Sequence, residues 1–400
     1  MRLRYKAATK EGKLSQGLLD AKDIQEAATY LRAKGLMPIQ ILRIDNQISS
    51  QIPFLNRVKT TELVLFTRQM SSMLSSGLTL MKSLEILREQ MTNVTMQEIT
   101  TSIINDVQEG KTFSQAISKH PKLFTTIYVS IIKAGESSGL LDKVLARLAD
   151  NLEKEAKLKS TIRGALMYPI IVIILMTAVM FIMMIFVIPQ LTVLYDNLNV
   201  PLPLPTQVLI GLSNFLTVFW PVILGLLVAF GYFLKRWSNT LSGRLIIDDI
   251  LLKIPVFGKL IRQTILAEFS RTLGLLVGTG TLVVEALNET AETAGNIHYK
   301  NAIIGIGNQV EKGVTVGTAM ASSTLFPPLL IQLTKIGEQT GKLDETLQKA
   351  SEYFEREVDQ MVKTLTTAME PFIMIVLGIG VAFLIISVIT PIYSLMSSIQ

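Results

Sequence analysis

The side chains that most often perform chemistry in proteins are scarce in this sequence. Cysteine is absent, which excludes a disulfide scaffold, a cysteine-type zinc site and an iron–sulfur cluster. The only two histidines, His120 and His298, are too few for a histidine-rich metal site, and they form no Ser–His–Asp or HExxH pattern. His298 lies in segment 295–299, which we expect to be a loop. We predict no catalytic residue, no metal site and no cofactor.

Two segments resemble the end of a phosphate-binding loop. Residues 110–112 read Gly-Lys-Thr, but the glycine required five positions earlier is Asn105, and no strand precedes the segment. Residues 341–342 read Gly-Lys, with Ile336 at the corresponding position. Both segments lack the pattern that cradles phosphates, so we do not expect this chain to bind nucleotide.

The most specific local feature is the pattern Lys-x-Gly-Glu-x-x-Gly-x-Leu-Asp, which occurs at 133–142 and again at 335–344. One interpretation is a tight corner between helices, in which glycines permit positive φ or close packing and aspartates favour the next helix N-terminus. The other places Glu136 and Glu338 on an exposed corner, where they contact a partner protein or a cation. The residues of the structural interpretation are Gly135, Gly139, Gly337, Gly341, Asp142 and Asp344.

Three further charged residues are candidate partner contacts: Arg68, Arg271 and Glu370. Glu370 precedes Pro371 at the start of an apolar run, where a carboxylate is costly unless it is paired or hydrated. It either reaches the membrane interface or meets a positive group on a membrane partner. We expect Tyr168, Pro169 and Pro371 to mark the points where helices enter the membrane.

Three uncharged apolar runs dominate the remainder of the chain, at 170–188, 208–234 and 371–392. About 20 apolar residues suffice for a helix to cross a bilayer, so each run predicts a membrane span. The N-terminal segment lacks the apolar core of a cleavable signal peptide, and we expect the first span to direct insertion.

Basic residues fall on one side of these spans. Of the 38 lysines and arginines, 24 lie in residues 1–163 and 14 in residues 235–363. Because basic residues remain on the cytoplasmic side, the N-terminus is predicted to be cytoplasmic and the C-terminus periplasmic. Residues 1–163 carry a net charge of +8, since 24 basic residues oppose 16 acidic ones. This excess either reflects the usual bias beside a first span or serves an acidic partner or anionic lipid.

The chain also contains an internal repeat. Residues shifted by 203 or 202 positions match in type, among them Phe66 with Phe269, Glu136 with Glu338, and Pro169 with Pro371. The repeated unit is a helical bundle followed by its membrane helix. We therefore predict an all-α polytopic membrane protein with two repeated cytoplasmic helical bundles and a small N-terminal α/β module. The predicted segments are the module 1–45, a linker 46–59, the first bundle 60–169, the spans 170–188, 208–234 and 371–392, a periplasmic loop 189–207, the second bundle 235–370 and a periplasmic tail 393–400.

These features together resemble the type II secretion F family, the inner-membrane platform proteins of type IV pilus and type II secretion systems. The resemblance covers essentially the whole chain. It depends on the order of the following features: Tyr5, Ala7 and Gly12 near the N-terminus, the helix 66–77 and its twin 269–280, both Gly-Glu-x-x-Gly-x-Leu corners, and the segments 167–169 and 369–371 before the first and last spans.

The resemblance implies a non-enzymatic protein of the bacterial inner membrane. It implies contact with a cytoplasmic hexameric assembly or retraction ATPase, with pilin or pseudopilin transmembrane helices and with other inner-membrane machine components. It further implies a homo-oligomer in a lipid membrane that does not bind nucleic acid directly. Together with the +8 charge, it predicts that residues 60–169 dock the ATPase. Pilus assembly, secretion and DNA uptake are not separated by these residues.

An oligomeric membrane transporter is the alternative function. A transporter needs polar or charged groups inside its spans, or broken helices around a site at the middle of the membrane. The second span offers only Ser213, Asn214 and Pro221, and the others offer scattered serines and threonines. Substrate flux in vesicles would favour the transporter, and loss of filaments or secretion on deletion would favour the platform.

Overall fold

The computed structural model of the chain describes most of the sequence: residues 2–8, 14–21, 23–43, 58–187, 189–190, 193, 204–255 and 257–398. Most of the predicted linker 46–59 and of the predicted loop 189–207 lies outside the described residues, as does Gly12. The chain divides into two compact units, and each is described by itself. The first comprises Met1–Lys59 with Arg88–Ser102, and the second comprises Thr60–Leu87 with Ile103–Gln400.

The N-terminal part of the first unit is a three-stranded antiparallel sheet with one helix. Its elements are β1 (Arg2–Ala8), β2 (Leu14–Asp20), α1 (Ile24–Ala33) and β3 (Met37–Arg43), and the strand order is β2-β1-β3. Helix α1 begins because the Asp23 carboxylate accepts a hydrogen bond from Glu26 N at 2.7 Å. Ala7, Ala27 and Leu31 are buried. The apolar side of α1 therefore contributes the small core of this module.

The first repeat is built from short helices followed by one long one. They are α2 (Thr60–Ser75), α3 (Leu80–Gln90), α4 (Val94–Gln108), α5 (Phe113–Ser118), α6 (Thr126–Ser138) and α7 (Leu141–Ile182), which ends in a π-helical turn, Met183–Val187. In the second unit, Phe66, Phe124 and Tyr128 form a buried aromatic cluster, and the Tyr128 hydroxyl lies 3.0 Å from Thr67 Oγ1. This cluster ties α2 to α6.

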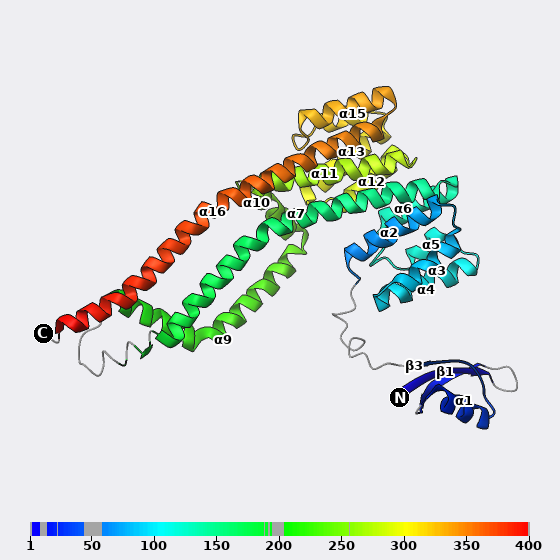
Figure 1. Ribbon diagram of the computed structural model, residues 1–400. Coiled ribbons are helices and arrows are strands. Elements are labelled where there is room, and N and C mark those ends of the chain that lie inside the picture. Colours follow the sequence, from blue (N-terminus) through cyan, green and yellow to red (C-terminus); the bar gives the residue numbers. More distant parts are fainter. Residues whose placement is uncertain are drawn as a thin grey trace. The chain divides into compact units, whose positions relative to one another are not determined.

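The second repeat has the same plan. After α9 (Leu204–Ser238) come α10 (Leu241–Lys253), α11 (Phe257–Gly278), α12 (Val283–Thr293), α13 (Ile297–Glu311), α14 (Val316–Ala321), α15 (Pro328–Thr340) and α16 (Leu343–Ser398). Phe269, Phe326 and Tyr299 form the corresponding aromatic cluster. The long helices α7 and α16 each run from a bundle into an apolar segment without a break at Pro169 or Pro371 (Figure 1).

Two local predictions were wrong. Segment 295–299 is a loop only at its first two residues, because α13 begins at Ile297 and the Asn296 side chain accepts hydrogen bonds from His298 N and Tyr299 N. Asparagine at that position is a helix N-cap signal, which the loop interpretation overlooked. The placement of Glu136 on the corner itself was also wrong, because Glu136 lies in the last turn of α6, which ends at Ser138.

Among the described residues, two helical segments are long and apolar enough to cross a membrane, Leu141–Phe186 and Leu343–Ala382. They include residues 170–186 of the first predicted span and residues 371–382 of the last, and α16 itself continues to Ser398. Helix α9 contains the uncharged run 208–234. The two end helices also meet in their apolar parts, since a Cβ on Gly380 would lie 3.1 Å from Met176 Cε.

Candidate functional site

The two duplicated glutamates bind the N-termini of short helices. Glu136 accepts hydrogen bonds from Phe113 N at 2.7 Å, from Ser114 N at 3.1 Å and from Ser114 Oγ at 2.7 Å. Backbone N–H groups at a helix start lack partners within the helix, and a carboxylate satisfies them while complementing the helix dipole. Both carboxylate oxygens are thus occupied inside the first bundle.

Glu338 binds the N-terminus of α14 in the second bundle. Its carboxylate accepts hydrogen bonds from Val316 N and from Gly317 N, the latter at 2.8 Å. Glu136 and Glu338 are both half-buried rather than fully exposed. The structure therefore shows an internal contact for each glutamate, whereas contact with a partner protein or a cation remains a prediction. Among the residues that the structure describes, no group of three histidines or carboxylates is placed to hold a metal ion.

The glycines and aspartates of the duplicated pattern form the corner between two helices. Gly139 and Gly341 have φ angles of 69° and 68°, in the left-handed region that favours glycine. Each ends a helix, α6 or α15, and its N–H bonds back to the last turn. The other two glycines, Gly135 and Gly337, lie within those helices, and the aspartates Asp142 and Asp344 lie in the first turns of α7 and α16.

Close packing explains the glycines inside the helices. A Cβ on Gly135 would lie 2.9 Å from Val144 Cβ, and one on Gly337 would lie 2.1 Å from Thr346 Oγ1. Real Cβ atoms do not approach neighbours so closely. Any larger residue would push α6 away from α7, or α15 away from α16, and so open the corner.

Arg68 forms an ion-pair network on the surface of the first bundle. Its Nε and Nη2 atoms donate to the two oxygens of Glu153 at 2.6 and 2.7 Å, and Nη2 also pairs with Asp150. The hydrogen bonds to Glu153 and Asp150 raise the pKa of Arg68, and the hydrogen bond from Arg68 lowers the pKa of Glu153. The Arg68 side chain is 37% exposed. This network is accessible to a partner.

Arg271, the twin of Arg68, is buried. Its side chain is only 3% exposed, and Nη1 donates to Glu355 Oε1 at 2.8 Å. Ser351 Oγ donates to the same glutamate oxygen at 3.1 Å. Because Arg271 is enclosed, it presents almost no surface to a partner. Its predicted partner contact remains untested, but the structure gives it an internal ion pair.

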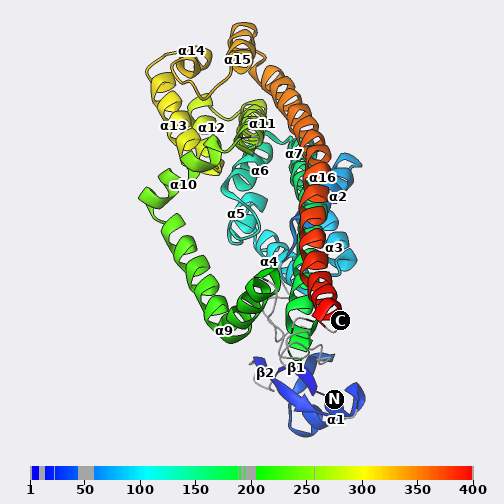
Figure 2. The same ribbon diagram turned by 90° about the vertical axis from the view of Figure 1, so that its left-hand side faces the viewer.

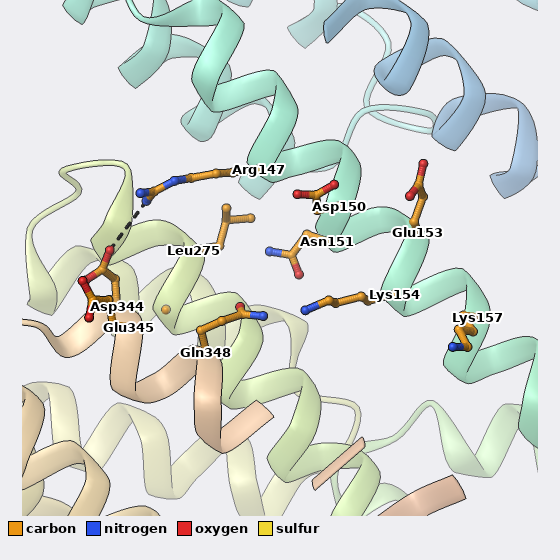
Figure 3. Close-up of a pocket in the computed structure, with 11 residues that line it drawn as sticks. Arg147, Asp150, Asn151, Glu153, Lys154, Lys157, Leu275, Asp344, Glu345 and Gln348 are labelled. Carbon is orange, nitrogen blue, oxygen red and sulfur yellow. Dashed lines mark ion pairs between the residues drawn. The ribbon is translucent and has the colours of Figure 1, made fainter. Parts of the chain in front are cut away.

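A polar cleft lies along the seam between the two repeats, with a volume of about 540 Å³. Figure 3 shows side chains of α7 on one side and those of α11 and α16 on the other. Arg147 on α7 donates to Gly278 O at 2.7 Å, and its Nη1 lies 3.6 Å from Asp344 Oδ2. Lys154 donates to Glu352 Oε1 at 3.1 Å. The first repeat thus contacts the second through charged side chains.

Sequence reasoning did not identify these seam residues. Arg147 corresponds to Lys349 in the second copy, and Lys154 to Arg356, so the pairs join positions that are not twins. One signal is Gly278, where a Cβ would lie 2.5 Å from Arg147 Nη1, so a side chain there would displace the end of this arginine. A lone glycine near a helix end does not reveal which arginine lies against it.

One carboxylate close to the seam has an altered pKa. Glu268 is half-buried on α11, and burial raises the pKa of its carboxyl group, partly offset by Lys159 and Arg271. An apolar cluster packs nearby along the same three helices: Leu158 of α7, Leu260 of α11, and Val358 and Val362 of α16. The twin position of Glu268 in the first repeat is Leu65, which is exposed.

The residues at the predicted membrane entries differ in exposure. Tyr168, Glu370 and Pro371 are exposed, and Pro169 is buried within α7. Among the described residues, no lysine or arginine pairs with Glu370. Its carboxylate is therefore open to a contact outside this chain, as either of the two interpretations requires.

Fold and site define a class: a membrane protein made of a duplicated helical bundle, each copy closed by a glycine corner and continued by a long apolar helix. Two family models match the chain. The model of the type II secretion system (T2SS) protein F matches residues 66–189 and 269–391, and the model of its N-terminal domain matches residues 4–42. The chain belongs to the type II secretion system protein F family, as the resemblance predicted.

Full-length relatives agree with this assignment. The chain is 38% identical to the type IV pilus assembly protein PilC of Thermus thermophilus, over 99% of this chain and 98% of the relative. It is 34% identical to the PilC protein of Myxococcus xanthus, over 99% and 95%. It is 29% identical to the type II secretion system protein F of Xanthomonas campestris, over 99% of each.

Proposed function

We propose that this protein is a non-enzymatic inner-membrane platform that couples a cytoplasmic hexameric ATPase to the insertion of pilin or pseudopilin subunits into a filament, or to their removal. The observation that carries this proposal is the continuity of α7 and α16, each of which runs from a helical bundle into an apolar segment. Pro169 in α7 and Pro371 in α16 each remove one hydrogen bond from the backbone ladder, but both helices continue through these positions. A displacement of the bundle therefore moves the membrane part of the same helix.

The proposed topology has three spans, with the N-terminus cytoplasmic and the C-terminus periplasmic. The middle span is α9, whose run 208–234 has no charged residue and is followed by Lys235 and Arg236. The complete restriction of basic residues to two stretches supports the orientation. The predicted domain boundaries are proposed with it, since both bundles must then lie on the cytoplasmic side.

The proposed partners are the ATPase, pilin or pseudopilin helices, other components of the machine, and further copies of this chain. The relatives are named as proteins of type IV pilus assembly and of type II secretion, which supports a role for this chain in a filament machine. Residues 60–163 hold 13 basic and 11 acidic residues, so most of the positive excess lies in residues 1–59. We therefore propose that the N-terminal module, as well as the bundle 60–169, contributes residues that bind the ATPase.

The coupling proposal is tested by interrupting one long helix. Three glycines are inserted between Arg163 and Gly164 of α7, because glycine weakens a helix and makes it flexible. The matched control carries the same insertion after Asn239, between α9 and α10. We expect the α7 variant to bind the ATPase and a pilin in mild detergent but to support no filament in cells. Normal filaments from that variant would refute mechanical coupling through α7.

A second measurement separates platform from transporter. The intact protein is purified in mild detergent with the ATPase and a pilin, and ATP hydrolysis is measured. We expect both partners to co-purify, with no hydrolysis by this chain alone. Absence of both partners together with substrate flux in vesicles would refute the platform. Binding of the ATPase by the isolated second bundle but not by the N-terminal part would refute the docking assignment.

A further inference from the structure

Helix α10 presents apolar side chains to solvent along one side. Ile246 and Ile250 lie one helical turn apart, and Ile254 follows at the next turn. All three are exposed, Ile250 at 53%. Spacing of four residues places them in one stripe. Contiguous exposed apolar surface of this kind usually marks an interaction site.

The opposite side of α10 is fixed to the second bundle. Asp248 Oδ2 accepts a hydrogen bond from Ile297 N at 2.7 Å, and Asn296 Nδ2 donates to Asp248 O at 3.4 Å. Leu252 is buried on this side. The hydrogen bonds to the start of α13 set the rotation of α10 about its axis. The isoleucine stripe therefore faces away from the bundle.

The stripe lies directly beyond the end of α9. Helix α9 ends at Ser238 and α10 begins at Leu241, and Figure 2 shows α10 continuing from that end. Aromatic and basic residues at the end of an apolar run are typical of the boundary between membrane and water. The last turns of α9 carry Tyr232, Phe233, Lys235, Arg236 and Trp237.

The charges around the stripe are mainly positive. Residues 235–262 include six basic residues and two acidic ones. Of the acidic pair, Asp248 is buried and Asp249 is paired with Lys253 at 2.6 Å. An apolar stripe beside excess positive charge complements a surface of acyl chains and anionic headgroups.

We propose that α10 lies in the headgroup region of the anionic cytoplasmic leaflet, with Ile246, Ile250 and Ile254 directed toward the acyl chains. The proposal rests on the topology proposed above, in which α9 ends on the cytoplasmic side. Amphipathic helices of this kind lie with their apolar face about 5–10 Å into the boundary. Since α10 is bonded to α13, this contact sets the angle between the second bundle and the membrane.

Spin labels on single cysteines test the proposal, and the chain has no native cysteine to interfere. The full-length variants are Ile250→Cys on the stripe, Ile336→Cys as control, and Leu226→Cys within α9. Ile336, on α15, is 50% exposed and so matches Ile250 in accessibility. Each variant is placed in nanodiscs of phosphatidylcholine with or without phosphatidylglycerol. Collisions with oxygen, which enters the bilayer, and with a water-soluble nickel chelate are then measured.

We expect the label at position 250 to favour oxygen over nickel severalfold more than the label at 336, and more strongly with phosphatidylglycerol. Equal ratios of oxygen to nickel collisions at positions 250 and 336 would overturn the proposal. Equal ratios at position 250 with and without phosphatidylglycerol would also overturn it. If the label at 250 were shielded from both oxygen and nickel, protein would cover the stripe. Broadening of its spectrum by the label of a second copy would mean the same. Nickel access at position 226 would instead refute the proposed topology.

Discussion

The two repeats place the same arginine in different surroundings. Arg68 forms its ion pairs on an exposed face of α2, whereas Arg271 forms its pair inside the second bundle. Helix α11 contacts both α7 and α16, and it begins at Phe257, two turns before the position that corresponds to the start of α2. The extra length packs Leu260 against α7 and α16. The same arginine–glutamate pair is therefore buried in the second copy and lies at the surface in the first.

The largest expected effect tests this difference in burial. Replacing Arg271 with alanine leaves Glu355 without its charged partner in a site that is only 20% exposed. Removing one member of a buried pair costs about 3–5 kcal/mol, whereas exposed pairs contribute roughly 0–1 kcal/mol. We expect Arg271→Ala to lower the melting temperature in detergent clearly, and Arg68→Ala to change it little. Equal shifts for the two variants would contradict the comparison.

The helix-capping glutamates provide the next effect. Helix α5 has a second cap, because Thr112 and Gln115 form a capping box, whereas the side chain of Thr315 makes no such bond at α14. Glu338→Ala should therefore destabilise the protein by about 2 kcal/mol and Glu136→Ala by about 1 kcal/mol. Thermal unfolding measures both. The Glu→Gln variants, which keep one acceptor, serve as controls, and a larger loss at Glu136 would reverse the assignment.

Glu268 should respond to pH, because burial raises its pKa in the folded protein. A carboxyl group whose pKa is higher in the folded state binds its proton more tightly there. Its contribution to stability therefore declines as the pH rises from the ordinary carboxyl pKa of about 4.3 through the raised value. We expect Glu268→Gln to raise the melting temperature at pH 7, with the gain shrinking toward pH 4. The twin position of Glu268 holds the exposed Leu65, so the control variant is Leu65→Gln. This variant should shift the melting temperature little, and by the same amount at both pH values.

The smallest effect concerns the seam between the repeats. Lys154 and Glu352 form a half-exposed ion pair, and hydrogen bonds from Gln348 and Lys154 lower the pKa of Glu352. A double-mutant cycle of Lys154→Ala and Glu352→Ala should give a coupling energy below about 1 kcal/mol. The coupling energy is measured from unfolding in detergent at low and at high salt. It should be smaller at high salt, because salt screens the ion pair. Coupling above about 3 kcal/mol would mean that the cleft is desolvated.

Much of this architecture was predictable from the sequence, because the repeat fixes positions by comparison within one chain. Helices α5, Phe113–Ser118, and α14, Val316–Ala321, lie at twin positions 203 residues apart. The glycine corner was visible because only glycine tolerates the φ angle at positions 139 and 341. Where twin positions hold the same residue type, they indicate which contacts recur within each bundle.

Burial and contacts between copies were not predictable in the same way. Arg68 and Arg271 are identical residues, and nothing in their local sequence tells which one is enclosed. The glutamates at 136 and 338 were expected to be exposed because each lies between the two glycines of the corner pattern. Their partners at positions 113, 114, 316 and 317 lie more than 20 residues away. The seam pairs join positions that are not twins, so the repeat offers no guide to them.

The π-helical turn Met183–Val187 has a consequence for the first membrane helix. A π turn holds one residue more than an α turn, and this extra residue rotates every later side chain by roughly 100° about the axis. A neighbouring helix that follows one stripe of α7 would lose that stripe at Met183. The face by which the first long helix contacts a neighbour therefore changes within this turn, which contacts α9 and buries Met184.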